Sequence, residues 1–143
     1  MENTKKQRNP SYKEEEWRFL LAKAQNTLKT VPSDQVVCMQ SSKGKLYSLI
    51  FADLKATIDA ADDMTKRLFA ELNTNSDKKI DKLVCMWNNG GIDLPSFALR
   101  DRLCKLDREN MTAKMLLQGL NALIVKEIGA TMPKEYQKDL ANG

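Results

Sequence analysis

Histidine is absent from the 143 residues of this chain. It is the side chain that most readily exchanges protons near neutral pH, and it is the commonest protein ligand of transition metals. Without it the chain cannot form a Ser-His-Asp triad or a Cys-His couple. Carboxylates, lysines and hydroxyls remain, but the motifs GxGxxG, GxxxxGK[ST] and GxSxG are all missing. The sequence therefore predicts that the protein is not an enzyme.

Cysteine is scarce, and its spacing is unsuited to metal binding. Cys38, Cys85 and Cys104 lie far apart in the sequence, whereas structural zinc sites normally use about four ligands in close pairs. An odd number of cysteines without a signal peptide is typical of reduced thiols in or near the core. We therefore expect no metal, no cofactor and no disulfide.

Long apolar runs are also missing. No stretch approaches the roughly 18 apolar residues that a membrane span requires, and the N-terminal segment MENTKKQRNPSYKEEE is charged with no apolar stretch behind it. We expect an intracellular protein, cytoplasmic or nuclear, that does not enter a membrane. With 42% hydrophobic residues, the chain is long enough for one domain with a core and too short for two.

Positive charge is concentrated at the N-terminus. Lysine and arginine number 23 against 19 aspartates and glutamates, which gives a formal net charge of +4. Most of this excess lies in residues 1–13, where the charged side chains are those of Glu2, Lys5, Lys6, Arg8 and Lys13. The rest of the chain is nearly neutral, unlike a nucleic-acid-binding domain with a basic stripe on its folded face.

This distribution predicts two regions. Residues 1–10 are interpreted as a disordered basic tail and residues 11–140 as the folded, helical domain. Within the tail, Lys5, Lys6 and Arg8 are candidates for a nuclear import signal or for phosphate contacts with nucleic acid.

Apolar residues recur with a helical period along much of the chain. Ser11 and Glu14 have the spacing of a capping box, which predicts that a helix begins there. The pair Val31 and Pro32 predicts its end. The apolar face of this helix consists of Trp17, Leu20, Leu21, Ala24 and Leu28.

Further helices are predicted in the same way. A long pattern covers residues 46–72, a short one covers 80–87 before a pair of glycines, and another follows Pro95 with Leu99, Leu103 and Leu106 as its buried row. The segment 115–128 is apolar over much of its circumference, which favours a central helix. The expected fold is all-α, a single-domain bundle of about five helices, with one short extended segment near residues 35–40 as the open alternative to a helical turn.

Residues 73–83, NTNSDKKIDKL, resemble the beginning of a calcium-binding EF-hand loop. Such a loop needs oxygen ligands at positions 1, 3 and 5, a glycine at 6 and a glutamate at 12. Counted from Asn73, position 6 is Lys78 and position 12 is Val84. The segment is therefore not expected to bind calcium. Its short polar side chains predict instead the end of one helix and the cap of the next.

The functional hypothesis from the sequence is a small intracellular helical module, an adaptor or regulatory subunit without catalytic activity that binds another protein. It rests mainly on the exclusions above. Trp87, next to the glycine pair, and Phe97 are the candidate contacts with a protein partner, because aromatic residues often anchor interfaces. Packing into the core is the alternative role for both.

The alternative function is a nucleic-acid or chromatin-associated protein that uses the basic N-terminal arm. Lys78, Lys79 and Lys82 would then add a second small patch for phosphate groups. The sequence does not identify the partner or the oligomeric state.

Overall fold

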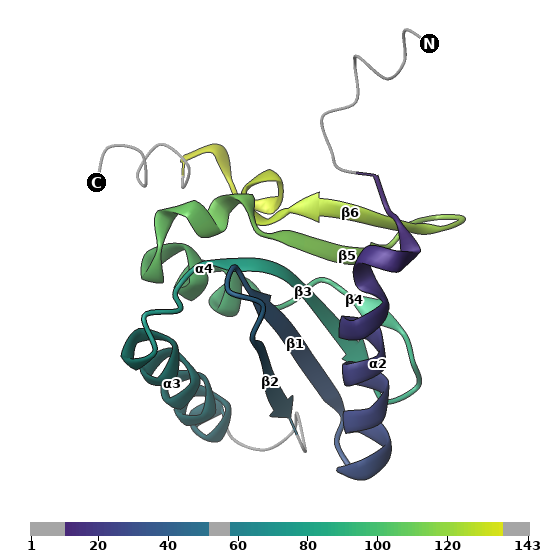
Figure 1. Ribbon diagram of the computed structural model, residues 1–143, viewed down its shortest axis with the longest axis horizontal. Coiled ribbons are helices and arrows are strands. Elements are labelled where there is room, and N and C mark those ends of the chain that lie inside the picture. Colours follow the sequence, from purple (N-terminus) through teal and green to yellow (C-terminus); the bar gives the residue numbers. More distant parts are fainter. Residues whose placement is uncertain (1–10, 52–57, 136–143) are drawn as a thin grey trace, which may run out of the picture.

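The computed structural model describes residues 11–51 and 58–135 of the chain. These residues form three α-helices and one mixed sheet of six strands (Figure 1). The prediction of an all-α bundle of about five helices is therefore wrong, and the fold is α/β. The ambiguous segment near residues 35–40 is a strand.

The elements, labelled as in Figure 1, are α2 (Glu14–Thr30), β1 (Gln35–Ser41), β2 (Leu46–Phe51), α3 (Ile58–Thr74), β3 (Ile80–Trp87), β4 (Ile92–Asp93), α4 (Phe97–Leu106), η1 (Arg108–Thr112), β5 (Lys114–Gln118), β6 (Leu123–Glu127) and η2 (Ile128–Thr131).

The sheet has the strand order β2, β1, β3, β5, β6, with the short β4 added to β3. Strand β1 runs antiparallel to both β2 and β3, and β3 runs parallel to β5. Strands β2, β3 and β5 therefore all point in the same direction. Helix α3 connects β2 to β3, and η1 follows the helix α4 that connects β3 to β5.

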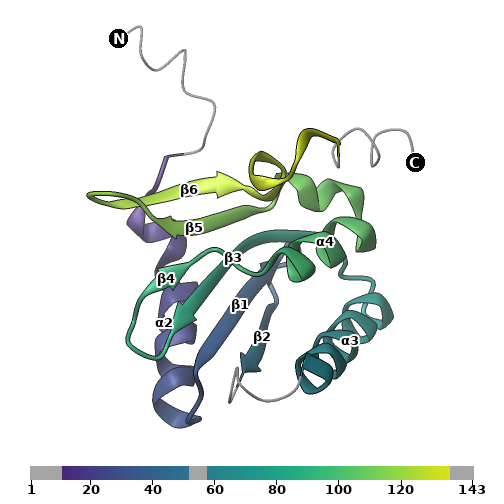
Figure 2. The same cartoon turned by 180° about the vertical axis from the view of Figure 1, so that it is seen from behind.

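The two faces of the sheet are covered by different helices, as the two opposite views in Figures 1 and 2 show. Side chains alternate along β1, because successive residues of a strand point to opposite faces. Val36 and Cys38 pack with Trp17 of α2, whereas Val37 and Met39 belong to the core formed with α3 and α4. The sheet is thus buried on both sides between two helical layers.

Burial on both sides explains why several strands were predicted as helices. A strand covered on both faces has a continuous apolar run instead of an alternating pattern, and short runs of this kind do not distinguish strand from helix. In the segment 80–87 the residues from Leu83 to Met86 are all buried, so the strand β3 carries no alternation. The predicted long helix over 46–72 is wrong in its first part, which is β2; Tyr47 and Leu49 are its buried residues, and the apolar pattern runs on into α3. The predicted helix over 115–128 is the β5–β6 hairpin, in which two short apolar strands follow each other closely.

Three predicted helices are present. Helices α2 and α4 match their predicted ranges closely, and α3 occupies the second part of the predicted long helix. The capping box at the start of α2 is wrong, because the N-cap residue is Lys13 and no side chain caps the helix there. None of the described helices has both the length and the apolar character needed to cross a membrane.

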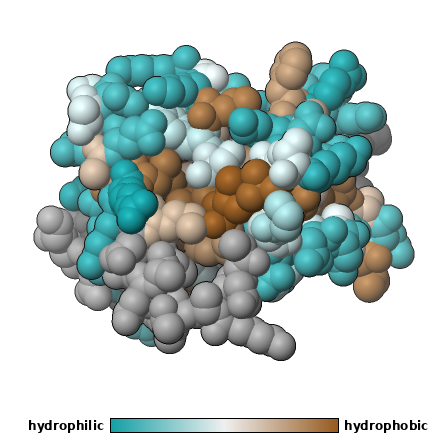
Figure 3. Space-filling model, turned by 90° about the horizontal axis from the view of Figure 1, so that it is seen from below, coloured by the Kyte–Doolittle hydropathy of each residue, from teal (hydrophilic) through white to brown (hydrophobic). Residues whose placement is uncertain are grey.

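The common direction of β2, β3 and β5 gives the molecule two distinct ends. We call the end where these strands finish, and where α3 and α4 begin, the carboxyl pole. The opposite end, the amino pole, contains the β1–β2 turn, the segment from α3 to β3 and the end of α4. Figure 3 views the molecule from below Figure 1, where β2 finishes, and shows apolar side chains in the middle with hydrophilic side chains at the left, the top and the right.

Candidate functional site at the carboxyl pole

The carboxyl pole contains both aromatic residues that the sequence predicts as binding residues. Trp87 is the last residue of β3, and its indole N–H donates to Asp93 Oδ2 at 3.2 Å. Asp93 Oδ1 also accepts from the backbone N–H of Leu94 at 2.7 Å. Phe97 is the first residue of α4, and its side chain is 47% exposed. The segment between Trp87 and Phe97 is therefore short, and the hydrogen bond from Trp87 to Asp93 holds it against the end of β3.

The turn after β3 returns the chain toward α4. Gly90 has φ of 89°, in the left-handed region that favours glycine, and its N–H donates to the carbonyl of Trp87 at 2.8 Å. The N–H of Trp87 in turn donates to the carbonyl of Gly91 at 2.8 Å. The Asn-Asn-Gly-Gly run is thus a strand-to-strand turn between β3 and β4, not the end of a helix.

Helix α4 begins with a side-chain cap. Ser96 is the N-cap residue, and its Oγ accepts from the backbone N–H of Leu99 at 3.2 Å. This bond satisfies one of the unpaired amides in the first turn. Pro95 is buried just before the cap, and Leu99 is only 5% exposed and belongs to the core.

Arg100 connects this helix start to the C-terminal part of the described chain. Its side chain is 7% exposed, and its Nε donates to the carbonyl of Pro95 at 3.0 Å. One terminal nitrogen donates to Oγ1 and to the carbonyl of Thr131, at 2.8 and 3.2 Å. The guanidinium also lies 5.7 Å from the ring centroid of Phe97. Burial lowers the pKa of Arg100 from its ordinary value, and the neutral oxygens around it keep its N–H groups hydrogen-bonded.

The three cysteines are buried with free thiols, as the sequence predicts for residues in the core. Burial raises the pKa of Cys85 to about 12 and that of Cys104 to about 11, and it also raises the pKa of Cys38. At neutral pH these groups are protonated thiols. Because the thiolate is the form that attacks substrates and binds metals, none of them is set up for either role.

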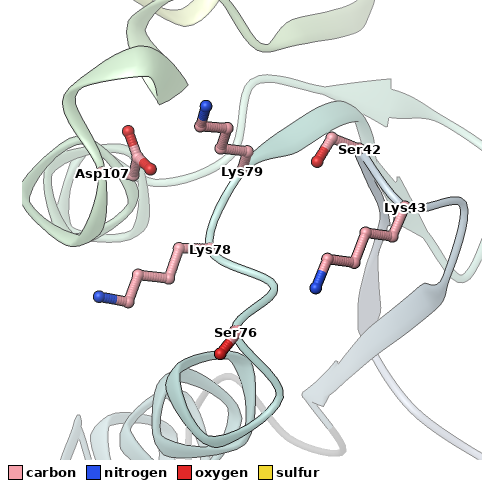
Figure 4. A pocket seen from close by; sticks show the side chains of 6 residues that line it. All are labelled: Ser42, Lys43, Ser76, Lys78, Lys79 and Asp107. Carbon is pink, nitrogen blue, oxygen red and sulfur yellow. The ribbon is translucent and has the colours of Figure 1, made fainter.

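The amino pole has a pocket of about 440 Å³ with a different character. It is lined by Ser42, Lys43, Ser76, Lys78, Lys79 and Asp107 (Figure 4). Figure 4 shows the three lysine side chains extending in different directions from the rim instead of meeting at one point. Lys79 also forms an ion pair with Glu109 at 2.8 Å.

The predicted second basic patch is divided in the structure. Lys78 and Lys79 line the pocket at the amino pole, but Lys82 Nζ donates to the carbonyl of Glu16 in α2 at 2.7 Å and lies 5.9 Å from the ring centroid of Trp17. The predicted basic arm, Lys5, Lys6 and Arg8, lies outside the described residues.

The loop that resembles an EF-hand has a structural role. Ser76, with φ of 54°, donates its N–H to Asn73 at the end of α3, and Asp77 is 3% exposed. Asp77 Oδ2 accepts from the hydroxyl of Tyr47 at 2.7 Å, and within the described residues its Oδ1 is buried without a hydrogen-bond partner. The segment leads into strand β3, so the predicted cap of a following helix is wrong.

Comparison with known proteins shows which solved structures share the fold of this chain. No protein-family model matches the sequence, and no curated protein is similar to it in sequence. Solved structures do match. The cytidine deaminase of Mycobacterium leprae has a TM-score of 0.59 at 12% identity, over 82% of this chain and 98% of its own.

Two further cytidine deaminase structures match this chain over a similar length. The cytidine deaminase of Bacillus anthracis has a TM-score of 0.57 at 13% identity, over 86% of this chain and 96% of its own. A single-residue variant of the cytidine deaminase of Mycobacterium tuberculosis has a TM-score of 0.56 at 12% identity, over 82% and 95%. The chain has the cytidine deaminase fold.

This result corrects two functional predictions. The prediction of a helical adaptor without catalytic activity is wrong, because the chain contains a six-stranded sheet and shares its fold with three enzymes. The prediction that the protein is not an enzyme is contradicted on the same ground. A role of Trp87 and Phe97 in binding a protein partner stays a prediction.

The zinc chemistry of deaminases does not fit the residues of this chain. Zinc deaminases hold the metal through one histidine and two cysteines, or three cysteines, with the signature H-x-E and P-C-x-x-C. This chain has no histidine, and none of its three cysteines is followed two residues later by glutamate. At the start of α4, the five residues from Pro95 to Leu99 read P-S-F-A-L, with Ser96 and Leu99 where the signature P-C-x-x-C has its two cysteines. The described residues also contain no group of three histidine, cysteine or acidic side chains that could hold a metal.

Sequence reasoning found the aromatic residues of the pole but missed Asp93, Ser96 and Arg100. The signal for Ser96 was present, because a serine directly after a proline and before an apolar helical pattern is a common N-cap. No local signal connects Arg100 with Thr131, since they lie 31 residues apart.

Proposed function

We propose that the protein binds a small molecule containing a nucleobase, in the form of a nucleoside, at the carboxyl pole. The observation that carries the proposal is the fold shared along nearly the whole length of three cytidine deaminases, enzymes named for a nucleoside. In open α/β sheets, ligands bind outside the carboxyl ends of the strands, which is where β3 ends and α4 begins here.

The pole offers groups that suit a nucleobase. The half-exposed ring of Phe97 provides a flat apolar surface next to the guanidinium of Arg100. Trp87 supplies a second aromatic side chain, and Asp93 supplies carboxylate oxygens next to it. Base stacking on aromatic side chains contributes about 1–3 kcal/mol per base. The residues present do not supply a zinc-activated water, so deamination by that route is not part of this proposal.

The experiment is a titration of the purified chain with cytidine, uridine and adenosine, followed by calorimetry and by NMR. We expect at least one nucleoside to bind, and Phe97→Ala to weaken binding about 5- to 150-fold if stacking provides the energy stated above. Product formation is measured in the same samples by chromatography.

The matched control is Phe19→Ala, because Phe19 is a phenylalanine on α2 that is 77% exposed. It should leave nucleoside binding unchanged. Circular dichroism must show that both variants keep their secondary structure. The proposal fails if no nucleoside binds at its solubility limit, or if Phe97→Ala and Phe19→Ala behave alike.

We also propose that the protein resides inside the cell, in the cytoplasm or the nucleus. The support is the set of three buried free thiols, Cys38, Cys85 and Cys104, which is typical of a reducing compartment. Fractionation of cells that express a tagged full-length chain tests this location, and recovery from the culture medium would contradict it.

A further inference from the structure

We infer that the start of α4 is held in place by the hydrogen bonds of Ser96 and Arg100, without zinc. The inference concerns how the carboxyl pole is built, and it is independent of whether a nucleoside binds there. It rests on the contacts of three residues at the helix start and on the residue types available in the chain.

Ser96 and Leu99 stand where the signature P-C-x-x-C has its two cysteines, and both have structural roles here. Ser96 Oγ accepts from the N–H of Leu99 at 3.2 Å and so caps the helix. The Leu99 side chain is 5% exposed and packs in the core between the sheet and the helices. Neither side chain can become a thiolate, which is the cysteine form that zinc binds.

Arg100 provides the connection between segments that a metal with several ligands would otherwise provide. Its guanidinium joins the carbonyl of Pro95, before α4, to the hydroxyl and the carbonyl of Thr131, after β6. The Thr131 hydroxyl donates onward to the carbonyl of Ile128 at 2.7 Å. The hydrogen bonds therefore run from the loop before α4 through one buried side chain into η2.

The planar guanidinium is suited to this role. Arginine presents several N–H donors in a fixed geometry, and its burial at 7% exposure makes each donor costly to leave unpaired. Cys104, one turn further along α4, does not take part in a metal site, because its thiol is buried and donates to Met111 Sδ at 3.4 Å.

The test measures zinc content and thermal stability of the full chain purified from zinc-supplemented medium. We expect far less than one zinc ion per chain by elemental mass spectrometry, and a melting temperature that EDTA shifts by no more than about 1 °C. Arg100→Met should lower the melting temperature by about 5–10 °C, because it removes from a buried site the hydrogen bonds to Pro95, Thr131 and Met132 Sδ. Thr131→Val, which keeps the side-chain shape, should lower it by about 2–4 °C.

The control is Arg18→Met, the same substitution at an exposed position of α2, which should leave the melting temperature nearly unchanged. The inference is overturned if about one zinc ion per chain copurifies and EDTA lowers the melting temperature by several degrees. It is also overturned if Arg100→Met and Thr131→Val melt like Arg18→Met. Should Arg100→Met not fold, the zinc content of the parent chain and the Thr131→Val result still decide the question.

Discussion

The two poles of this molecule are built from opposite ends of the same helices and strands, yet they differ in charge and in hydrogen bonding. Helices α3 and α4 begin at the carboxyl pole, which therefore has the positive ends of their dipoles together with the half-exposed Phe97 and the cap at Ser96. The amino pole has the negative ends of these two helices, and Lys43, Lys78 and Lys79 line its pocket. Positive side chains near the negative ends of helices are electrostatically favourable.

Hydrogen bonding separates the poles further. At the amino pole, buried side chains join distant segments: Asn110, which follows α4, bonds to Lys78 and Ile80 at the start of β3 and to Leu103 within α4. Asp77 accepts from the hydroxyl of Tyr47 in β2. At the carboxyl pole, the bond between Trp87 and Asp93 is exposed and short-range in sequence. The buried bonds of Asn110 and Asp77 stabilise the amino pole, and the buried Arg100 stabilises the start of α4. The exposed bond of Trp87 indicates that the end of β3 is the part of the carboxyl pole that tolerates change.

The largest effect is expected for Asn110→Ala at the amino pole. The amide of this fully buried residue accepts from the N–H of Ile80 at 2.7 Å and donates to the carbonyls of Lys78 and Leu103, both at 2.8 Å. Its removal leaves these backbone groups without partners and should lower the free energy of unfolding by about 3 kcal/mol. Urea denaturation measures this loss. The exposed Asn89→Ala is the control, and equal losses in both variants would contradict the comparison.

The next largest effect is a dependence of the free energy of unfolding on pH, caused by the thiol of Cys85 in the core between the poles. Burial raises the pKa of Cys85 from 9.0 to about 12, so the folded state favours the neutral thiol. The stability from this shift is complete below pH 9 and is lost as the pH rises from 9 toward 12. The free energy of unfolding should fall by up to about 1.4 kcal/mol per pH unit because of this group.

The Cys85→Ala variant isolates that contribution. The substitution lowers stability at all pH values because it removes a buried side chain, but it should make the decline above pH 9 less steep. Denaturation curves at pH 8, 9 and 10 provide the comparison of the two slopes. Parallel slopes in the parent and the variant would show that the thiol does not ionise on unfolding.

A smaller loss is expected for Tyr47→Phe. The hydroxyl of Tyr47 donates to Asp77 Oδ2 at 2.7 Å, and within the described residues the other oxygen of this buried carboxylate has no partner. Removal of the hydroxyl should lower the free energy of unfolding by about 1–2 kcal/mol. Thermal denaturation measures it, with Tyr12→Phe on the N-terminal side of α2 as the control. A variant as stable as the parent would mean that water replaces the hydroxyl fully.

The smallest effect is expected for Trp87→Phe at the carboxyl pole. It removes the N–H that donates to Asp93 across an exposed 3.2 Å bond but keeps an aromatic ring. The loss in free energy of unfolding should be about 0.5 kcal/mol, because water replaces exposed partners. Chemical denaturation of the variant checks this value. A loss as large as that of Asn110→Ala would remove the difference between the poles.

The amphipathic helices of this fold were predictable, and the sheet was not. Helices α2 and α4 each have one buried face and one exposed face, which produces a readable period. Strand β3 lies between two helical layers and gives no alternation. One sequence signal was available in the segment 115–128, namely Gly119, because a glycine inside an apolar pattern can mark a turn. The structure shows the reason: a Cβ atom at this position would lie 2.6 Å from the carbonyl oxygen of Ala122, in the tight turn of the β5–β6 hairpin.

The candidate site could be predicted only in part. Trp87 and Phe97 were identified because exposed or terminal aromatic residues near a glycine turn are recognisable in a sequence. Their arrangement at one pole follows from the antiparallel β3–β4 turn, which was predicted to be the end of a helix. The parallel pairing of β3 with β5 is long-range and leaves no local pattern. The contacts of Arg100 with Thr131 depend on the same pairing, so no local pattern indicates them.

The parallel pairing of β3 with β5 also determines how the molecule opens. It extends only over Lys82–Val84 and Lys114–Leu116, whereas β1 pairs with β3 along nearly its full length. Apart from the two-residue strand β4, the β5–β6 hairpin is the part of the sheet held by the fewest paired residues, so less strand pairing opposes its local opening. Its release uncovers the buried Met115 and Leu116 together with an unpaired edge of β3. An unpaired strand edge beside newly exposed apolar side chains is the combination that favours pairing with a second chain.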